Sequence, residues 1–179
     1  MSVFGIIILV LAVVFIYLFN GLLLKRSAVD NHWIYLVAVL KKRNEMLMDL
    51  QEKLQETFPD LAQKAAESTE AFSPRLGVEK MGEFDAGQTA LLKKIFAPGG
   101  TAENNQSLQD LAGDFNETES TLVLLRSCYN KEVSNLNNVI AVPAFALLAR
   151  AMKISARETF AMPAEEWCKA AENMPKLFK

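Results

Sequence analysis

The stretch LQDLAGDFNETESTLVLLRSCYNKEVSNLNNV, residues 108–139, decides the fold of this chain. Apolar residues recur in it at alternating steps of three and four, the heptad pattern of a helix that presents one side to a partner. The seam consists of Leu108, Leu111, Phe115, Thr118, Leu122, Leu125, Tyr129, Glu132, Leu136 and Val139. Only Thr118 and Glu132 are polar among them. This regularity predicts a long helix that packs against another long helix, in an antiparallel bundle or through self-association.

Another seam precedes it in the chain, where no Gly or Pro interrupts residues 22–58. In chain order, we call this one the first seam and that of residues 108–139 the second seam. The apolar members of the first seam are Val29, Trp33, Leu36, Leu40, Leu47, Leu50, Leu54 and Leu61, with one gap at Arg43. We expect this helix to end or kink near Pro59, and helix to continue to about residue 72. The Gly- and Pro-containing segment SPRLGVEKMGEFDAG, 73–87, predicts a break, and QTALLKKIF, 88–96, a short helix. After Pro143, two shorter helices are expected over 145–160 and 162–174. The fold class is therefore all-α.

The first segment, SVFGIIILVLAVVFIYLFNGLLL, carries no charged residue over positions 2–24. A helix of this length spans about 34 Å, enough for a hydrocarbon core of about 30 Å. The main alternative is a secretory signal peptide, against which stand the missing basic residues at its start and the missing small-x-small cleavage site. We expect residues 1–24 to form a transmembrane helix that continues into a helical bundle domain, residues 25–179.

The composition argues against several functional classes. Nineteen Lys and Arg residues balance 21 Asp and Glu residues, which disfavours a nucleic-acid binder. The cysteines Cys128 and Cys168 and the single histidine, His32, show no metal-ligand spacing. Carboxylate pairs such as Glu117 and Glu119 resemble solvated helix faces. We therefore expect no enzyme, no metal and no cofactor.

Arg43 stands in the gap of the first seam, so its side chain is expected to point into the bundle. One interpretation is a buried ion pair with Glu132, the acidic residue in the second seam, which would set the register of the two helices. The other is an arginine at the bundle edge whose charged end reaches water.

Arg126, Asn130 and Asn137 form a polar stripe beside the second seam, next to Tyr129. Such a stripe can line a polar groove for a ligand. It can also form a ladder of hydrogen bonds between helices, in which buried amides specify the pairing, and this interpretation is favoured.

Two groups of basic residues are candidates for contact with a membrane surface. Lys25 and Arg26 directly follow the apolar segment, and by the positive-inside rule they favour an outside N-terminus with the bulk of the chain in the cytoplasm. Arg150, Lys153 and Arg157 would share one face of a helix over 145–160. That face can lie on anionic lipid or can simply face water.

Two motifs resemble the LemA family. The first comprises AVDNHW, residues 28–33, and LKKRNEMLMDL, 40–50; the second comprises NETES, 116–120, and RSCYNKEVSNLN, 126–137, before Pro143. Where that family usually has Pro and Asn, this chain has Met48 and Asp49, so we expect no kink there. The resemblance implies a bacterial inner-membrane protein with a long-helix bundle on one anchor and no established catalytic activity. Its relatives include a magnetosome-membrane protein, and some members are encoded beside membrane proteases.

The expected function is thus a homo-oligomeric scaffold that organises or shapes the inner membrane, or holds partner proteins there. The alternative is an adaptor that binds one specific membrane protein, such as a protease or sensor. Its binding surface would be the acidic region 44–91, which holds ten acidic and four basic residues.

Overall fold

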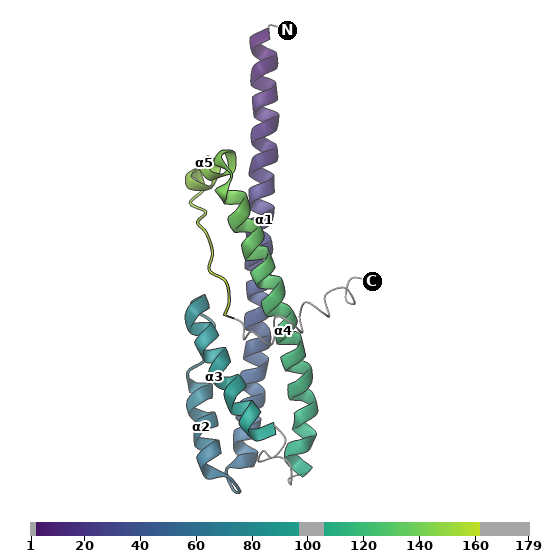
Figure 1. Ribbon diagram of the computed structural model, residues 1–179, viewed down its shortest axis with the longest axis vertical. Coiled ribbons are helices and arrows are strands. Elements are labelled where there is room, and N and C mark those ends of the chain that lie inside the picture. The colour runs from purple at the N-terminus through teal and green to yellow at the C-terminus, as the bar shows by residue number, and fades with distance from the viewer. Residues whose placement is uncertain (1–2, 97–105, 162–179) are drawn as a thin grey trace. The chain divides into compact units, whose positions relative to one another are not determined.

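The structure, a computed structural model, describes residues 3–96 and 106–161 (Figure 1). The helices in this part of the chain are α1 (Val3–Leu54), α2 (Pro59–Glu70), α3 (Val78–Phe96), α4 (Gln106–Ala141) and α5 (Pro143–Ala151). No strand occurs in these residues, which confirms the all-α fold class. The helix expected over 162–174, and Cys168 within it, lie outside the described residues.

Helix α1 runs for 52 residues without interruption. It passes through Met48 and Asp49 unbroken, as expected from the absence of Pro. An 18-residue window within it has a mean hydropathy of 2.9 and is only 6% buried, so this helix is long and apolar enough to cross a membrane. A signal sequence has the same properties. Between Val3 and Tyr17, the exposed large apolar side chains have 47–75% of their surface accessible.

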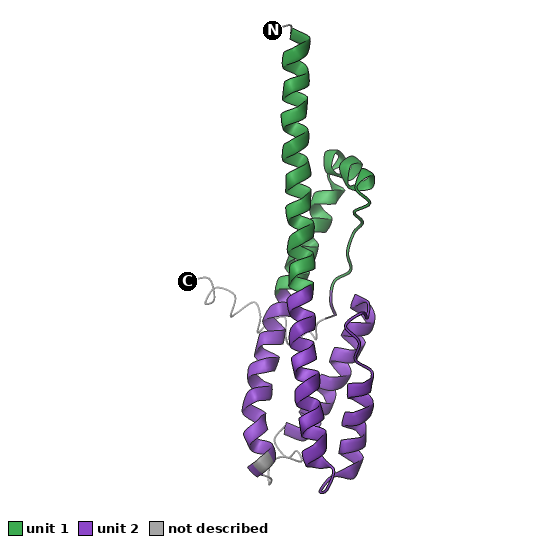
Figure 2. Ribbon diagram, turned by 180° about the vertical axis from the view of Figure 1, so that it is seen from behind, with its two compact units in different colours: residues 1–33, 128–159 green, residues 34–127, 160–179 purple. Residues whose placement is uncertain are grey.

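The chain divides into two compact units (Figure 2). Unit 1 comprises residues 1–33 and 128–159, and unit 2 comprises residues 34–127 and 160–179. Helices α1 and α4 each contribute to both units.

Unit 2 is a helical bundle, whose apolar core draws on α1, α2, α3 and α4. The core side chains are Leu47, Leu50, Leu54, Ala62, Ala65, Leu91, Leu92, Ile95, Leu108 and Phe115. Members of both predicted seams are among them, and Phe96 and Phe115 add a ring contact at 5.4 Å. Burial of these side chains is the main force that holds the four helices together.

The connection between α1 and α2 follows from Pro59. Helix α1 ends at Leu54, and Pro59 is the first residue of α2, where its missing N–H is no loss. Phe58 before it has φ −139° and ψ 66°, outside the α region that a following proline disfavours.

The break predicted over 73–87 is too long. Helix α3 begins at Val78, so its first ten residues fall inside that segment. The turn is confined to residues 71–77, where the amide of Leu76 donates to the carbonyl of Ser73. Gly82 and Gly87 lie within α3 because packing of its apolar side outweighs the low helix propensity of glycine.

In unit 1, α4 packs along α1. The rings of Trp33 and Tyr129 lie 5.4 Å apart, and Leu22, Val29 and Leu136 are buried. Helix α5 then turns away from α4 by 101° at the break before Pro143.

The helix predicted over 145–160 is wrong in its extent, since α5 ends at Ala151 and residues 154–161 are not helical. Lys153 has a φ of 54°, in the left-handed region. Its amide donates to the carbonyl of Arg150 at 3.2 Å, and the amide of Ile154 donates to that of Ala149 at 2.8 Å. This pair of bonds is the Schellman motif, which closes a helix and redirects the chain.

Candidate functional site

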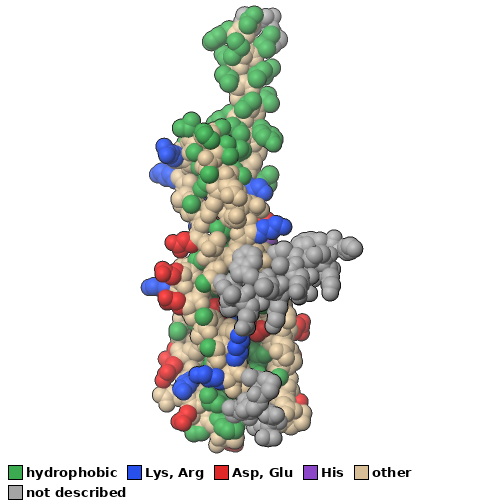
Figure 3. Space-filling view, viewed as in Figure 1, with side chains coloured by type: hydrophobic (Ala, Val, Ile, Leu, Met, Phe, Trp, Pro, Cys, Tyr) green, Lys and Arg blue, Asp and Glu red, His purple; other side chains and the backbone are tan. Residues whose placement is uncertain are grey.

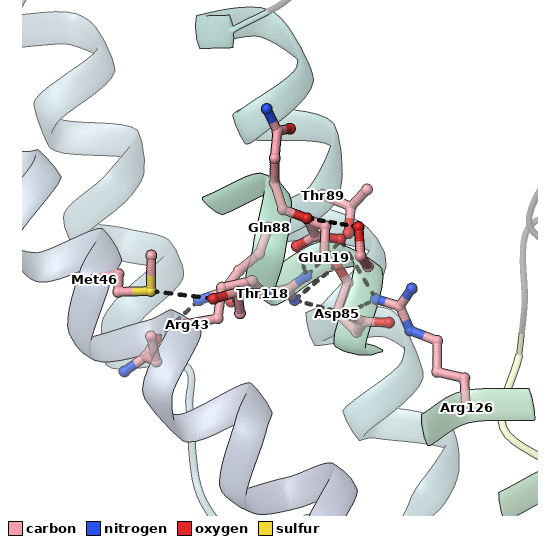
Figure 4. Close-up of polar contacts among 11 residues, drawn as sticks. Arg43, Met46, Asp85, Gln88, Thr89, Thr118, Glu119 and Arg126 are labelled. Atoms are coloured by element: carbon pink, nitrogen blue, oxygen red, sulfur yellow. Dashed lines mark hydrogen bonds and ion pairs between the residues drawn. The ribbon is translucent and has the colours of Figure 1, made fainter. Parts of the chain in front are cut away.

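Arg43 is fully buried, with 0% of its surface exposed, and its guanidinium is surrounded by polar groups of α3 and α4 (Figure 4). Nη2 lies 2.6 Å from Oδ1 of Asp85, and Nη1 lies 2.6 Å from Oε1 of Glu119. Nε donates to Gln88 at 3.0 Å, and Nη1 also donates to Thr89 at 3.1 Å. A buried charge needs such partners, because its loss of hydration is otherwise uncompensated.

A second buried arginine completes the cluster. Arg126, 1% exposed, places Nη2 2.6 Å from the same Oδ1 of Asp85 that receives Arg43. Its Nη2 is also 3.9 Å from Oε2 of Glu119, whose side chain is 26% exposed. The formal charges of two guanidinium groups and two carboxylates cancel. Asp85 therefore joins α1, α3 and α4 through one oxygen atom.

Neutral side chains extend this network to α2. The amide of Gln88 donates to Oδ1 of Asn44 at 2.8 Å, and the amide of Asn44 donates to the carbonyl of Thr69 at 3.4 Å. Thr118, the polar seam residue of α4, directs its hydroxyl to the sulfur of Met46 at 3.5 Å. All four helices of unit 2 are thus connected by polar contacts beside the apolar core.

The contacts of this cluster are those of a network of buried ion pairs. Its carboxylates are held by guanidinium groups at hydrogen-bond distance, an arrangement that favours fixed geometry over proton transfer. Among the described residues, no group of His, Cys, Asp and Glu is arranged to hold a metal ion. We call these residues, Arg43, Asp85, Glu119 and Arg126, the arginine–carboxylate cluster.

The pairing predicted between Arg43 and Glu132 is wrong, since Asp85 and Glu119 take that place. Glu132 instead accepts a hydrogen bond from the amide of Asn135, three residues further along α4, at 3.3 Å. Glu119 was interpreted as part of a solvated face, which is also wrong. The interpretation of Arg43 as an edge residue fails because none of its surface is exposed.

Asp85 escaped the sequence interpretation because the Gly content around it suggested a break, and Gln88 was predicted to begin the short helix 88–96 but was given no role. The spacing of residues in α3 nevertheless indicates that Asp85 and Gln88 face the bundle. The buried residues of α3 recur at steps of four and three, as in the other seams: Met81, Asp85, Gln88, Leu92 and Ile95. Asp85 and Gln88 occupy the polar positions of this third seam, opposite the polar gap of α1.

The three residues of the predicted stripe, Arg126, Asn130 and Asn137, do not share one set of partners. Arg126 belongs to the arginine–carboxylate cluster, and Asn130 is buried with 6% of its surface exposed. Asn137 binds the backbone of Arg157 twice: its amide donates to the carbonyl, and its Oδ1 accepts from the N–H, both at 2.9 Å. Its partner is thus a non-helical segment and not a helix, which corrects the predicted ladder.

Tyr129 holds the same segment. Its hydroxyl donates to the carbonyl of Glu158 at 3.1 Å. Burial raises the pKa of Tyr129, Arg157 opposes this rise, and the carboxylates of Glu158 and Asp30 add to it. Beside it, burial raises the pKa of the Cys128 thiol, with Lys131 lowering it and Glu132 raising it further.

The basic residues predicted to contact a membrane surface lie in unit 1 but not on one helical face. Arg150 is exposed in the last turn of α5, whereas Lys153 and Arg157 come after that helix. Arg157 forms an ion pair with Asp30 at 3.2 Å, and Arg26 lies 3.6 Å from the same carboxylate. Lys25, next to Arg26 on α1, is partly exposed. The shared helical face predicted for Arg150, Lys153 and Arg157 is therefore wrong, because the helix ends first.

Comparison with known proteins yields no match for this chain, whether with protein-family models, curated proteins or solved structures. The function is accordingly argued from the fold, the arginine–carboxylate cluster and the exposed surfaces.

Proposed function

We propose that this chain is a membrane-anchored helical scaffold of the LemA type, which assembles with copies of itself and organises or shapes the bacterial inner membrane or holds partner proteins there. The observation that carries the proposal is the continuity of α1. One unbroken helix contains both the exposed apolar stretch and the buried residues Arg43, Leu47 and Leu50 of the bundle. The same helix therefore supplies both the candidate span and part of the bundle core.

The arginine–carboxylate cluster supports a scaffold and gives no support to an enzyme. Buried ion pairs select one register among the helices more than they add stability. A rigid bundle with a single register, in the antiparallel arrangement predicted from the seams, suits repeated assembly, since every copy then presents the same surface.

The surface for self-association is assigned to the outward side of α1 just beyond the span. Ile34 and Tyr35 are each 62% exposed, and Ala38, about one turn further on, is exposed as well. Exposed apolar groups that adjoin one another on a helix are typical of contact surfaces. We assign this row to a second copy of the chain.

Light scattering coupled to size exclusion tests the assembly on the detergent-solubilised full chain. We expect a mass of several copies that persists on dilution, and a smaller mass for the double variant Ile34→Ser with Tyr35→Ser. Glu52→Ser, at an exposed position of the same helix, serves as the control and should leave the mass unchanged. A clean monomer across all concentrations would refute self-assembly.

Membrane anchoring and orientation have separate tests. The chain should stay with the membrane pellet after alkaline carbonate extraction. A fluorescent protein fused after Lys179 should be bright and an alkaline phosphatase fused there inactive if the bulk is cytoplasmic, as Lys25 and Arg26 predict. The opposite pair of results would reverse the orientation and leave the anchor intact.

A second candidate function is the adaptor, favoured by the acidic surface of unit 2. Of the ten acidic residues in 44–91, only Asp85 is buried, and the other nine are exposed. In-cell crosslinking from Glu45→Cys or Glu52→Cys would recover one defined membrane protein if this function is correct. Recovery of self-contacts alone would favour the scaffold.

A further inference from the structure

Helix α5 is apolar on both its buried and its exposed side apart from one residue in its last turn, which is unusual for a short helix at the surface of a protein. Its sequence, PAFALLARA, contains one charged residue, Arg150, in the last turn. Phe145, Leu148 and Ala149 are partly or fully buried, whereas the opposite side is exposed. A helix that is hydrophobic all round normally lies in an apolar environment.

The exposed side of α5 consists of apolar residues as well. Leu147 is 71% exposed and Val142, just before the helix, 48%. Pro143, Ala144 and Ala151 are also exposed. Nothing among the described residues covers this side.

The position of α5 along α1 indicates what covers it. A β-carbon placed on Gly21 would lie 3.8 Å from Cε1 of Phe145, so the buried side of α5 meets α1 within the apolar stretch. Gly21 precedes Lys25 by four residues, or about 6 Å along the helix. Interfacial helices place their apolar side about 5–10 Å into the boundary between headgroups and acyl chains. The depth of α5 therefore matches that boundary if α1 spans the bilayer.

The orientation of α5 and the charge of the residues around it are also consistent with a position at the lipid surface. Because α5 turns by 101° from α4 and α4 packs along α1, α5 runs across the span and not parallel to it (Figure 1). Figure 3 shows hydrophobic side chains covering α5 and the apolar part of α1, with Lys and Arg side chains at the edge of this area. In the described residues of unit 1, six basic residues outnumber three acidic ones, a balance suited to an anionic lipid surface.

We propose that α5 is an interfacial helix embedded in the lipid leaflet, with Val142 and Leu147 among the upper acyl chains and Arg150 and Lys153 at the level of the headgroups. This rests on the proposed function in one respect, since α1 must first span the membrane. The helix then holds unit 1 at a fixed depth and displaces lipid from one leaflet only, a device by which an assembled scaffold bends a membrane.

Fluorescence quenching in vesicles tests the depth of α5. The full chain, with Cys128 and Cys168 replaced by Ser, receives a single environment-sensitive label at Leu147→Cys, or at Ala151→Cys one turn further on. Vesicles of phosphatidylcholine and phosphatidylglycerol carry a nitroxide quencher either high or low on the acyl chain. We expect blue-shifted emission from both labels and stronger quenching by the high quencher than by the low one.

Two control labels on α1 show which part of the proposal fails if the result differs. A label at Leu11→Cys, within the apolar stretch, should be quenched more by the low quencher, and one at Met48→Cys, about 36 Å beyond Leu24 along α1, should not be quenched. If Leu11 is quenched while Leu147 and Ala151 behave like Met48, the interfacial helix is refuted and the anchor stands. If Leu11 is not quenched, the anchor itself fails. Blue-shifted emission from Leu147 without quenching would show that protein covers this side, and would also overturn the inference.

Discussion

Arg43 and Asp85 form an ion pair of 2.6 Å between Nη2 and Oδ1, with side-chain exposures of 0% and 5%. They come from α1 and α3, 42 residues apart in the chain. The same oxygen of Asp85 receives Arg126 from α4. One carboxylate therefore fixes the relative position of three helices, and this arrangement leads to the first two predictions.

Replacing Asp85 by Ala should destabilise unit 2 by about 3–5 kcal/mol, because two buried guanidinium groups lose their shared counter-charge. Urea unfolding of the full chain in detergent, followed by circular dichroism, measures the change. Glu83→Ala, at an exposed position two residues away on α3, should change stability by no more than about 0.5 kcal/mol. Similar effects of the two substitutions would contradict the role given to Asp85.

Arg43→Met should cost less than Asp85→Ala, about 1–3 kcal/mol, although both remove the same ion pair. The reason is that Asp85 keeps Arg126, and Glu119, 26% exposed, can turn toward water. The same unfolding experiment gives the comparison. An equal or larger loss for Arg43→Met would mean that the arginine, and not the carboxylate, is the centre of the cluster.

Lys153→Gly should stabilise unit 1 by about 1 kcal/mol, because a residue with a Cβ is disfavoured in the left-handed region and glycine is not. The amide of Ile154, which closes the Schellman motif, should exchange its hydrogen more slowly. Ala151→Gly, in the last helical residue of α5, should act in the opposite direction by a similar amount. Faster exchange in Lys153→Gly would contradict this account of the helix end.

Stability of unit 1 should fall at alkaline pH through Tyr129, whose pKa is raised by burial. Below pH about 10 the side chain is neutral in both the folded and the unfolded state, so its contribution is fully present. As the pH rises further, the unfolded state releases the proton first, and the contribution is lost through the raised pKa of the folded state. Tyr129→Phe should remove this part of the alkaline loss in thermal unfolding. An alkaline loss that is unchanged in Tyr129→Phe would contradict this account.

The sequence was sufficient for those features that rest on periodicity. The apolar stretch, the unbroken α1 and the burial of Leu36, Leu40, Leu47 and Leu50 follow from spacing and from the absence of Pro and Gly. The inward direction of Arg43 followed as well, because a gap in a heptad still faces the partner helix. Each of these is a property of one helix considered alone.

The sequence predicts that Arg43 pairs with a carboxylate, but not with which one. A buried guanidinium requires a carboxylate, but the choice among Asp85, Glu119 and Glu132 depends on how far each helix is displaced along its neighbour, and no local pattern encodes that displacement. Glycines in α3 concealed Asp85 for a related reason: intrinsic propensity is weak beside the burial of Met81, Leu92 and Ile95 on the same side.

By itself, then, the sequence determined that this protein is all-helical, where its long helices lie and which sides they bury, since periodicity and side-chain chemistry act within a single helix. Only the tertiary structure decided that Asp85 joins Arg43 to Arg126, that Asn137 and Tyr129 hold the segment after α5, and that α5 meets Gly21. These contacts depend on the register between helices and on one left-handed residue, Lys153. Both result from packing over the whole chain.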